Sequence, residues 1–273
     1  MAAPPGGKPG PGETRSGGRR AGKAAVRRPG SRRSNPFRYD EKRLQALGDT
    51  ACRIAGADEV GRGCLAGPLV VASVVLDYRK RPASRLKGLT DSKALTAKHR
   101  EELYPRVLAA ADRVSVVAVT PGRIDAVGLH RCNLLALIEA FERLQGGYDL
   151  GLVDGFDLRR PDLKADRLIG GDWLSAAVGA ASIVAKVTRD RLMHHLDEHH
   201  PGYGFAEHVG YGTKTHQRAL RELGPSPIHR HSFSLVASLC AGEALTLFEE
   251  EGAATSGAGA ADVHAGTAEG GAN

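Results

Sequence analysis

Four acidic side chains in this sequence stand at the ends of apolar runs, where they could bind metal ions. They are Asp58, Glu59, Asp154 and Asp172. A bound Mg²⁺ keeps several waters and takes one or two protein carboxylates together with phosphate oxygens, so a pair of neighbouring ions requires several acids. The acids therefore indicate a metal-dependent site for phosphodiester chemistry.

A Gly-Arg-Gly turn, Gly61-Arg62-Gly63, follows the first acidic pair almost directly. Backbone N–H groups in such a turn, and a guanidinium, can both bind phosphate oxygens. One short segment thus combines groups that bind cations with groups that bind phosphate. This combination makes a nuclease the leading hypothesis.

Each of these acids also has a simpler interpretation. Neighbouring residues in a regular strand point to opposite faces, so Glu59 is expected to share a site with Asp58 only if it already lies in the turn. Otherwise Glu59 is a surface acid. Asp154 precedes Gly155 and could be a turn residue, and Asp172 could be a helix N-cap.

Alternating strands and helices are expected to position the acids. Apolar and β-branched clusters predict strands at 53–57, 69–76, 114–120, 150–153 and 167–169. Apolar residues at helical spacing predict helices at 125–144, 174–196, 213–223 and 235–248. Functional groups gather at strand ends in an open α/β sheet, so acids distant in sequence can converge there. The pattern predicts an α/β core with a helical C-terminal extension.

Charge divides the 273-residue chain into three parts. Residues 1–36 hold nine Lys/Arg and one Glu, a net charge of +8, whereas residues 249–273 carry a net charge of −5. Both ends are rich in small and polar residues, so we expect a disordered basic arm and a disordered acidic tail around a catalytic domain at 37–248. The domain is left with +4 of the total of +7, which favours a polyanionic partner. The arm either adds nonspecific affinity for nucleic acid or has no specific role.

The four cysteines are widely spaced, at Cys52, Cys64, Cys132 and Cys240. The sequence shows no Cys-x-x-Cys motif and no signal-peptide-like apolar segment, which predicts a reducing, cytoplasmic environment. Since no apolar run approaches the roughly 20 residues that span a bilayer, a membrane protein is not expected. Cys64 is interpreted as a small packing residue.

The order of several motifs resembles that of bacterial ribonuclease HII, the type 2 ribonuclease H, between residues 50 and 240. The matching segments are 58–63, 67–68, 89–95, 153–155, 171–172, 180–191, 210–213, 227–230 and 232–233. Each motif alone is weak evidence, but the ordered set is specific. Residue 62 is Arg, where the sister family, ribonuclease HIII, typically has Lys.

The resemblance implies an α/β fold with an RNase H-like mixed five-stranded sheet flanked by helices. It also implies hydrolysis of the RNA strand of RNA–DNA hybrids and cleavage 5′ to single ribonucleotides in duplex DNA, leaving 3′-OH and 5′-phosphate ends. The four acids would hold two divalent ions, Mg²⁺ or Mn²⁺, per active site. We expect a monomer, and the balance between the two substrates stays open.

Substrate-binding residues are also implied by the resemblance. The Gly61-Arg62-Gly63 turn would grip the backbone around the ribonucleotide and sense its 2′-OH, which both donates and accepts hydrogen bonds. Tyr211 would stack beside the sugar on the DNA side of the junction. Lys93 and Lys186 would contact phosphate or, as an equal alternative, be solvated or paired surface residues.

Other functions fit the sequence less well. A noncatalytic nucleic-acid-binding protein would not need four acids that repel phosphate in the absence of metal. A phosphoryl-transfer ATPase would need a Walker-type loop, which the sequence lacks. Histidines at 194, 195, 199 and 200 include i, i+4 pairs that could bind zinc. The sequence has no His-Glu-x-x-His motif, so we expect these histidines instead to lie near a helix C-terminus, where the helix dipole stabilises them. His229 and His231 are expected to pack or to touch phosphate.

Overall fold

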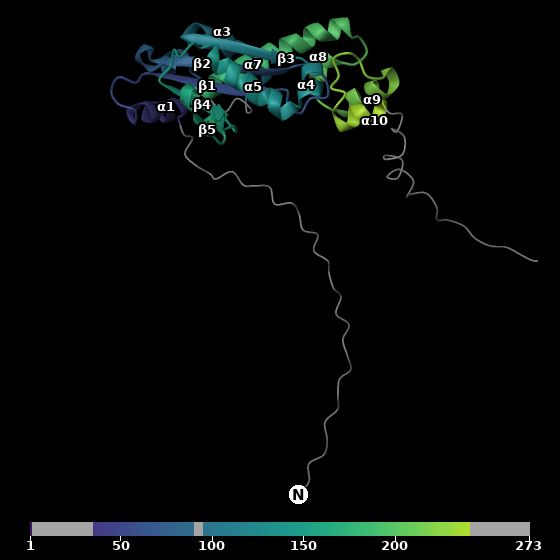
Figure 1. Ribbon diagram of the computed structural model, residues 1–273, viewed down its shortest axis with the longest axis horizontal. Coiled ribbons are helices and arrows are strands. Elements are labelled where there is room, and N and C mark those ends of the chain that lie inside the picture. Colours follow the sequence, from purple (N-terminus) through teal and green to yellow (C-terminus); the bar gives the residue numbers. More distant parts are fainter. Residues whose placement is uncertain (2–34, 90–94, 241–273) are drawn as a thin grey trace, which may run out of the picture. The chain divides into compact units, whose positions relative to one another are not determined.

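A single mixed sheet organises the part of the chain that the computed structural model describes, which is Met1 and residues 35–89 and 95–240, without the side chains of Asp172, Trp173 and Cys240. Its strands lie in the order β3-β2-β1-β4-β5 (Figure 1). They are β1 (Arg53–Val60), β2 (Leu69–Asp77), β3 (Arg113–Val119), β4 (Leu150–Asp154) and β5 (Ala165–Leu168). The pairs β1–β2 and β2–β3 are antiparallel, whereas β1–β4 and β4–β5 are parallel. The predicted mixed five-stranded sheet is confirmed.

Helices connect the strands and flank the sheet. In chain order they are α1 (Pro36–Gln45), α2 (Pro82–Arg85), α3 (Ala97–Ala110), α4 (Pro121–Val127), α5 (Leu129–Glu142), α6 (Gly171–Leu174), α7 (Ala176–His199), α8 (Phe205–His208), α9 (Lys214–Leu223) and α10 (Ser234–Cys240), with 3₁₀ turns at Tyr78–Lys80 and Pro161–Leu163. The last three helices form the expected helical C-terminal region. The helix predicted at 235–248 is described only as far as Cys240, and residues 241–248 lie outside the described part. None of the helices in the described part is long and apolar enough to cross a membrane.

The two faces of the sheet carry separate hydrophobic cores. Alternate residues of a strand point to opposite faces, so Ile54 of β1 joins the core that contains α7, whereas Ala57 joins the core that contains Phe141 of α5. β2 is buried along its whole length, as its unbroken β-branched run predicts. The central strands are therefore held rigidly from both sides.

α7 lies unusually close to β1. A Cβ at Gly56 would sit 2.1 Å from the backbone carbonyl carbon of Ala177, so only glycine allows the first turn of α7 to pack against the strand. Ser175 caps this helix, because its Oγ accepts a hydrogen bond from Val178 N at 3.3 Å. The close contact places the start of α7 next to the end of β1, which carries Asp58.

Two predicted helices differ from the observed ones in continuity. The helix expected at 125–144 is divided into α4 and α5 at Gly128, whose φ of 89° is outside the helical range. The helix expected at 174–196 begins only at Ala176, after the separate single turn α6. In both cases the apolar spacing continues across a backbone break that the spacing alone does not reveal.

α1 and α3 were not predicted from the sequence. In α1 the buried side chains are Phe37, Asp40 and Leu44, so a carboxylate interrupts the apolar stripe. Asp40 accepts hydrogen bonds from Tyr78 Oη at 2.6 Å and from Ala177 N at 3.0 Å. Burial raises the pKa of Asp40 to about 6. Asp40 thus occupies a buried helix position where an apolar residue is expected, because Tyr78 and Ala177 supply its hydrogen bonds.

Candidate active site

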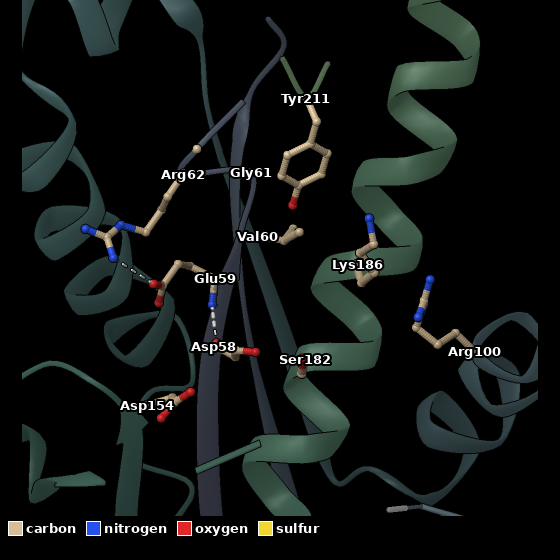
Figure 2. Close-up of a pocket in the computed structure, with 11 residues that line it drawn as sticks. Asp58, Glu59, Val60, Gly61, Arg62, Arg100, Asp154, Ser182, Lys186 and Tyr211 are labelled. Atoms are coloured by element: carbon tan, nitrogen blue, oxygen red, sulfur yellow. Dashed lines mark hydrogen bonds and ion pairs between the residues drawn. The ribbon is translucent and has the colours of Figure 1, made fainter. Parts of the chain in front are cut away.

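Three of the four predicted acids line one pocket, with a volume of about 340 Å³, at the end of the central strands. Asp58 and Asp154 come together because β1 and β4 run parallel and pair up to Ala57 and Val153, the residues just before them. Asp154 is the last residue of β4. Figure 2 shows the carboxylates of Asp58, Glu59 and Asp154 on the same side of this pocket.

Glu59 reaches the pocket from within the strand, so the expectation that it must lie in the turn is wrong. β1 continues to Val60, and Glu59 pairs with Val71 of β2. The pairing of β4 with β1 stops one residue before Asp154. Beyond that point β1 has no neighbour on the β4 side within the described sheet, so side chains from both of its faces can reach the same space.

Backbone hydrogen bonds orient two of the carboxylates. Asp58 Oδ1 accepts from Glu59 N, and Asp154 Oδ1 accepts from Gly171 N, each at 2.8 Å. The second bond ties the first residue of α6 to the end of β4. Asp172 is the next residue of α6, but its side chain lies outside the described part. The N-cap interpretation of Asp172 is wrong, because Gly170 and Ser175 cap α6 and α7.

Burial and electrostatic repulsion both act on Glu59 within the pocket. Burial and the negative charges of Asp58 and Asp154 raise the pKa of Glu59 to about 7, although Arg62 opposes this shift. Glu59 Oε2 is buried and makes no hydrogen bond of ordinary geometry among the described residues, although Asn133 is near enough to oppose the rise in pKa. Carboxylates brought together in this way are stabilised by a cation, so the residues fit a divalent metal ion.

The Gly61-Arg62-Gly63 turn lines the same pocket as the acids. Gly61 has a φ of 88°, which favours glycine. The Arg62 guanidinium turns toward the acids: its Nη1 lies 3.6 Å from Glu59 Oε1, and its Cζ lies 4.9 Å from the centre of the Phe156 ring. In Figure 2 the Arg62 side chain extends toward Glu59 and away from Tyr211, on the other side of the pocket.

Two fully buried arginines hold the loops around the pocket. Arg189 donates to the carbonyl oxygens of Ala66, Pro68 and Val209. Arg230 donates to the carbonyl oxygens of Gly67 and Arg62. Burial lowers the pKa of Arg230 to about 10. These side chains join segments that are far apart in the sequence into one rigid frame.

Sequence reasoning did not single out these arginines, although a signal existed for Arg189. It belongs to a row of buried α7 residues spaced four apart, with Ala181, Ala185 and Met193. A charged residue on such a stripe indicates a buried group with specific partners. Arg100 and Ser182, which also line the pocket, were likewise missed.

The side of the pocket opposite the acids is cationic and aromatic. Lys186 Nζ lies 2.8 Å from Asp190 Oδ1 and 5.7 Å from the centre of the Tyr211 ring. Arg100 of α3 and Lys186 line the same pocket, and the Tyr211 ring points into it (Figure 2). The predicted pairing of Lys186 is present, and its ammonium group still borders the pocket. Lys93 lies outside the described residues.

Three buried histidines lie behind Tyr211. His208 and His216 are stacked with ring centres 4.3 Å apart, and His229 Nε2 lies 3.1 Å from His216 Nε2. Burial lowers the pKa of both His216 and His229 to about 4. His229 therefore packs in the interior, which is one of the two roles expected for it.

These depressed pKa values predict acid destabilisation. Between about pH 6.5 and pH 4, His216 and His229 bind protons in the unfolded chain but stay neutral in the folded chain. The free energy of unfolding therefore decreases as pH falls through this range. Each histidine contributes up to about 1.4 kcal/mol per pH unit in this window. Asp40 and Glu59, whose pKa values are raised, act in the opposite direction. The measurement should therefore compare the pH dependence of the free energy of unfolding between the wild type and a variant.

Denaturant unfolding across this pH range should show a weaker acid dependence for His216→Gln than for the wild type. His195→Gln at an exposed site supplies a control for the substitution itself, and the acid dependence should weaken more in His216→Gln than in this control. Equal slopes for the wild type and both variants would contradict the prediction.

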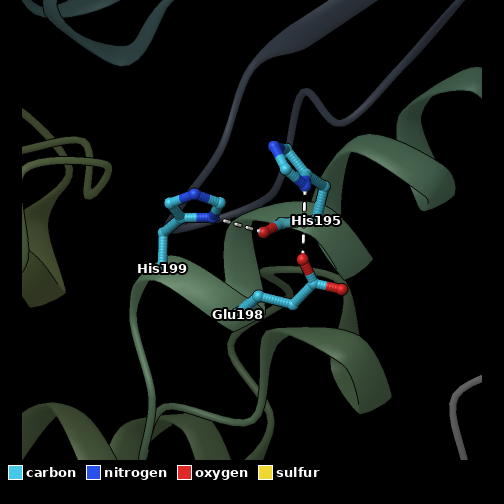
Figure 3. A group of neighbouring side chains, drawn as sticks. All are labelled: His195, Glu198 and His199. Carbon is cyan, nitrogen blue, oxygen red and sulfur yellow. Dashed lines mark hydrogen bonds and ion pairs between the residues drawn. The ribbon is translucent and has the colours of Figure 1, made fainter.

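A second histidine group lies near the end of α7. Donor atoms of His195, Glu198 and His199 lie within 4.8 Å of one another, and all three side chains are exposed (Figure 3). His195 Nδ1 is 3.4 Å from Glu198 Oε2, and His199 Nδ1 is 3.0 Å from the carbonyl oxygen of His195. None of these residues lines the pocket that contains the acids.

Known proteins are similar to this chain both in sequence and in fold. The family model for ribonuclease HII matches residues 55–236. A ribonuclease HII from Azorhizobium caulinodans is 50% identical over 198 residues, which cover 72% of this chain and 73% of that protein. The crystal structure of ribonuclease H2 from Pyrococcus horikoshii is similar with a TM-score of 0.60 and 28% identity, covering 70% of this chain and 98% of the other. Bst-RNase HIII in complex with Mn²⁺ shares the fold, with a TM-score of 0.55 and 17% identity over 74% of this chain and 73% of that one.

Proposed function

Since the chain belongs to the ribonuclease HII family and is a ribonuclease H, we propose that it cuts RNA–DNA hybrids and also cleaves 5′ to single ribonucleotides in duplex DNA, leaving 3′-OH and 5′-phosphate ends. One observation carries this proposal. The three described acids, the Gly61-Arg62-Gly63 turn and Tyr211 line the same pocket. Carboxylates that could hold metal ions at a phosphate thus lie next to groups that could distinguish ribose from deoxyribose.

We propose that Asp58, Glu59, Asp154 and Asp172 hold two divalent ions, Mg²⁺ or Mn²⁺. The mutual repulsion of the described carboxylates and the burial of Glu59 Oε2 without a hydrogen bond of ordinary geometry support this assignment. The similar fold of Bst-RNase HIII, whose crystal structure contains Mn²⁺, is consistent with it. Bound ions would supply a water of lowered pKa and stabilise negative charge on the leaving 3′-oxygen.

The chain's own residues would position the substrate. Lys186 and Arg100 lie opposite the acids, where their positive charges could bind phosphates that flank the scissile one. The backbone of the Gly61-Arg62-Gly63 turn would approach the ribonucleotide and contact its 2′-OH. We also propose that the enzyme acts as a monomer.

The direct test is cleavage of two end-labelled duplexes, one with a single ribonucleotide and one a long RNA–DNA hybrid. We expect both to be cut in Mg²⁺ and neither in excess EDTA. The single-ribonucleotide duplex should be cut at the 5′ side of the ribonucleotide. Cleavage that persists in EDTA would exclude the metal assignment, and failure to cut the single-ribonucleotide duplex would exclude junction recognition.

Tyr211→Ala should impair cleavage of a single embedded ribonucleotide more than cleavage of a long hybrid. Tyr211 is 40% exposed and lines the pocket, where a sugar could stack on its ring. A stacking contact is worth roughly 1 to 3 kcal/mol by alanine substitution, so kcat/KM should fall by about tenfold to a hundredfold on the first substrate. A long hybrid offers many registers with a 2′-OH on each side and should be affected less.

The matched control is Tyr211→Phe, which keeps the ring and should remain close to the wild type on both substrates. An equal loss on both substrates in Tyr211→Ala, or no loss on either, would show that Tyr211 is a packing residue.

A further inference from the structure

The pocket side of Tyr211 is open, but the backbone of this residue is held from behind by buried histidines. Tyr211 N donates to the carbonyl oxygen of His208 at 2.9 Å, and Tyr211 O lies 2.9 Å from His216 Nδ1. The preceding residue, Gly210, donates its N–H to His208 Nδ1 at 3.2 Å. None of these histidines lines the pocket, so any effect on substrate must act through Tyr211.

The hydrogen bonds fix which nitrogen of each histidine carries the proton. A backbone N–H can only donate, so His229 Nδ1 accepts from Ser226 N at 2.9 Å. The single proton of neutral His229 then lies on Nε2, which donates to His216 Nε2 at 3.1 Å. His216 must therefore carry its own proton on Nδ1, and that proton is donated to the carbonyl oxygen of Tyr211. Burial keeps both rings neutral, because it lowers the pKa of each to about 4.

The other side of this backbone contacts the Gly61–Gly67 region. Tyr211 forms an isolated β-bridge with Cys64, and Leu65 N donates to the carbonyl oxygen of Gly210 at 2.8 Å. Gly210 has a φ of 82°, and a Cβ there would lie 2.4 Å from the carbonyl oxygen of Ala66. The position of the Tyr211 ring is thus determined by two fixed surfaces, the loop after β1 and the histidine chain.

We propose that His216 is a positioning residue for ribonucleotide recognition, acting through its Nδ1–H bond to the carbonyl oxygen of Tyr211, with His229 enforcing the tautomer that makes this bond. The proposal rests on the proposed role of Tyr211 as the residue that stacks beside the sugar. Loss of the bond allows the Tyr211 backbone to shift relative to Cys64. The ring then no longer meets the sugar at the geometry that the acids require.

Two amides at position 216 separate this role from simple packing. The amide nitrogen of Asn is as many bonds from Cβ as His Nδ1, whereas that of Gln is as many bonds from Cβ as His Nε2. We expect His216→Asn to retain the bond to Tyr211 and near-wild-type selectivity. His216→Gln should lower kcat/KM on the single-ribonucleotide duplex by about tenfold relative to the long hybrid. In a Tyr211→Ala background it should cause no further loss of selectivity, because the ring through which it acts is already absent.

The wild-type protein allows an independent test that does not depend on folding of a variant. Long-range ¹H–¹⁵N NMR spectra of the histidine rings report the tautomer directly. We expect His216 to be protonated on Nδ1 and His229 on Nε2. His229→Asn, which loses the donor to His216 Nε2, should reproduce the selectivity defect of His216→Gln.

The outcomes distinguish failure of this inference from failure of the proposed function. If Tyr211→Ala changes the ratio of kcat/KM on the two substrates but His216→Gln does not, the positioning role is wrong and the role of Tyr211 stands. The positioning role is also overturned if His216 is protonated on Nε2, or if Asn and Gln at 216 lower both activities equally. If Tyr211→Ala leaves the ratio unchanged, the proposed role of Tyr211 fails and the role of His216 falls with it.

Discussion

Replacement of Asp58 or Asp154 by asparagine is expected to abolish cleavage while preserving the fold. Each carboxylate accepts a backbone hydrogen bond through Oδ1, from Glu59 N and Gly171 N respectively, and an asparagine Oδ1 can accept the same bond. What the substitution removes is the negative charge available to a divalent cation. We expect kcat to fall by a factor on the order of a thousand or more, about 4 kcal/mol of transition-state stabilisation.

The measurement is steady-state turnover in Mg²⁺, together with thermal unfolding and substrate binding. Asp149 provides a matched control, because it precedes the opposite end of β4 and accepts from Cys52 N and Arg53 N. Asp149→Asn should retain its turnover. Wild-type turnover in Asp58→Asn or Asp154→Asn under the same conditions would refute the assignment of these acids.

Gly61→Ala is expected to cause the largest loss of stability among substitutions in the Gly-Arg-Gly turn. Gly61 has a φ of 88°, and a Cβ at this position would lie 2.2 Å from Arg189 Nε. Arg189 cannot move aside cheaply, because it is fully buried and donates to three carbonyl oxygens. Backbone strain costs about 1 to 3 kcal/mol, and displaced hydrogen bonds add to it.

Thermal unfolding measures this effect. A loss of about 3 kcal/mol or more should lower Tm by roughly 6 to 12 °C for a chain of this size. Cleavage of both substrates should fall together, because the frame that holds the turn is disturbed.

Gly63→Ala is the matched control within the same turn. Gly63 has no positive φ, and a Cβ there would meet no atom within 4 Å. Its Tm should stay close to that of the wild type. If the turn approaches the nucleic-acid backbone as proposed, Gly63→Ala should instead raise KM. Equal Tm values for Gly61→Ala and Gly63→Ala would contradict the clamping role of Arg189.

The sequence alone supported the fold class and the type of chemistry. The unbroken β-branched run at 69–76 predicted a strand covered on both faces, because such a run has no polar side for solvent, and β2 is buried throughout. The ordered motifs supported membership of the ribonuclease HII family, which the comparisons show. Acids at strand ends predicted a convergent site, because parallel strands bring their ends to one edge. The structure indeed places Asp58 and Asp154 in one pocket.

Only the tertiary structure decided how Glu59 joins these acids. Strand periodicity places neighbouring side chains on opposite faces, but it does not show that β1 extends past its pairing with β4. The end of a neighbouring strand, distant in sequence, determines where both faces open to the same space.

The supporting frame was also decided by tertiary contacts. Arg189 and Arg230 bind carbonyl oxygens more than a hundred residues away along the chain, such as those of Ala66 and Arg62. The tautomer of His216 depends on His229, and through it on the backbone of Ser226. The type of a residue specifies what it can bind, whereas only the folded chain supplies the partner. Local sequence therefore indicated which groups we propose for the chemistry, whereas long-range packing determined which groups hold them in place.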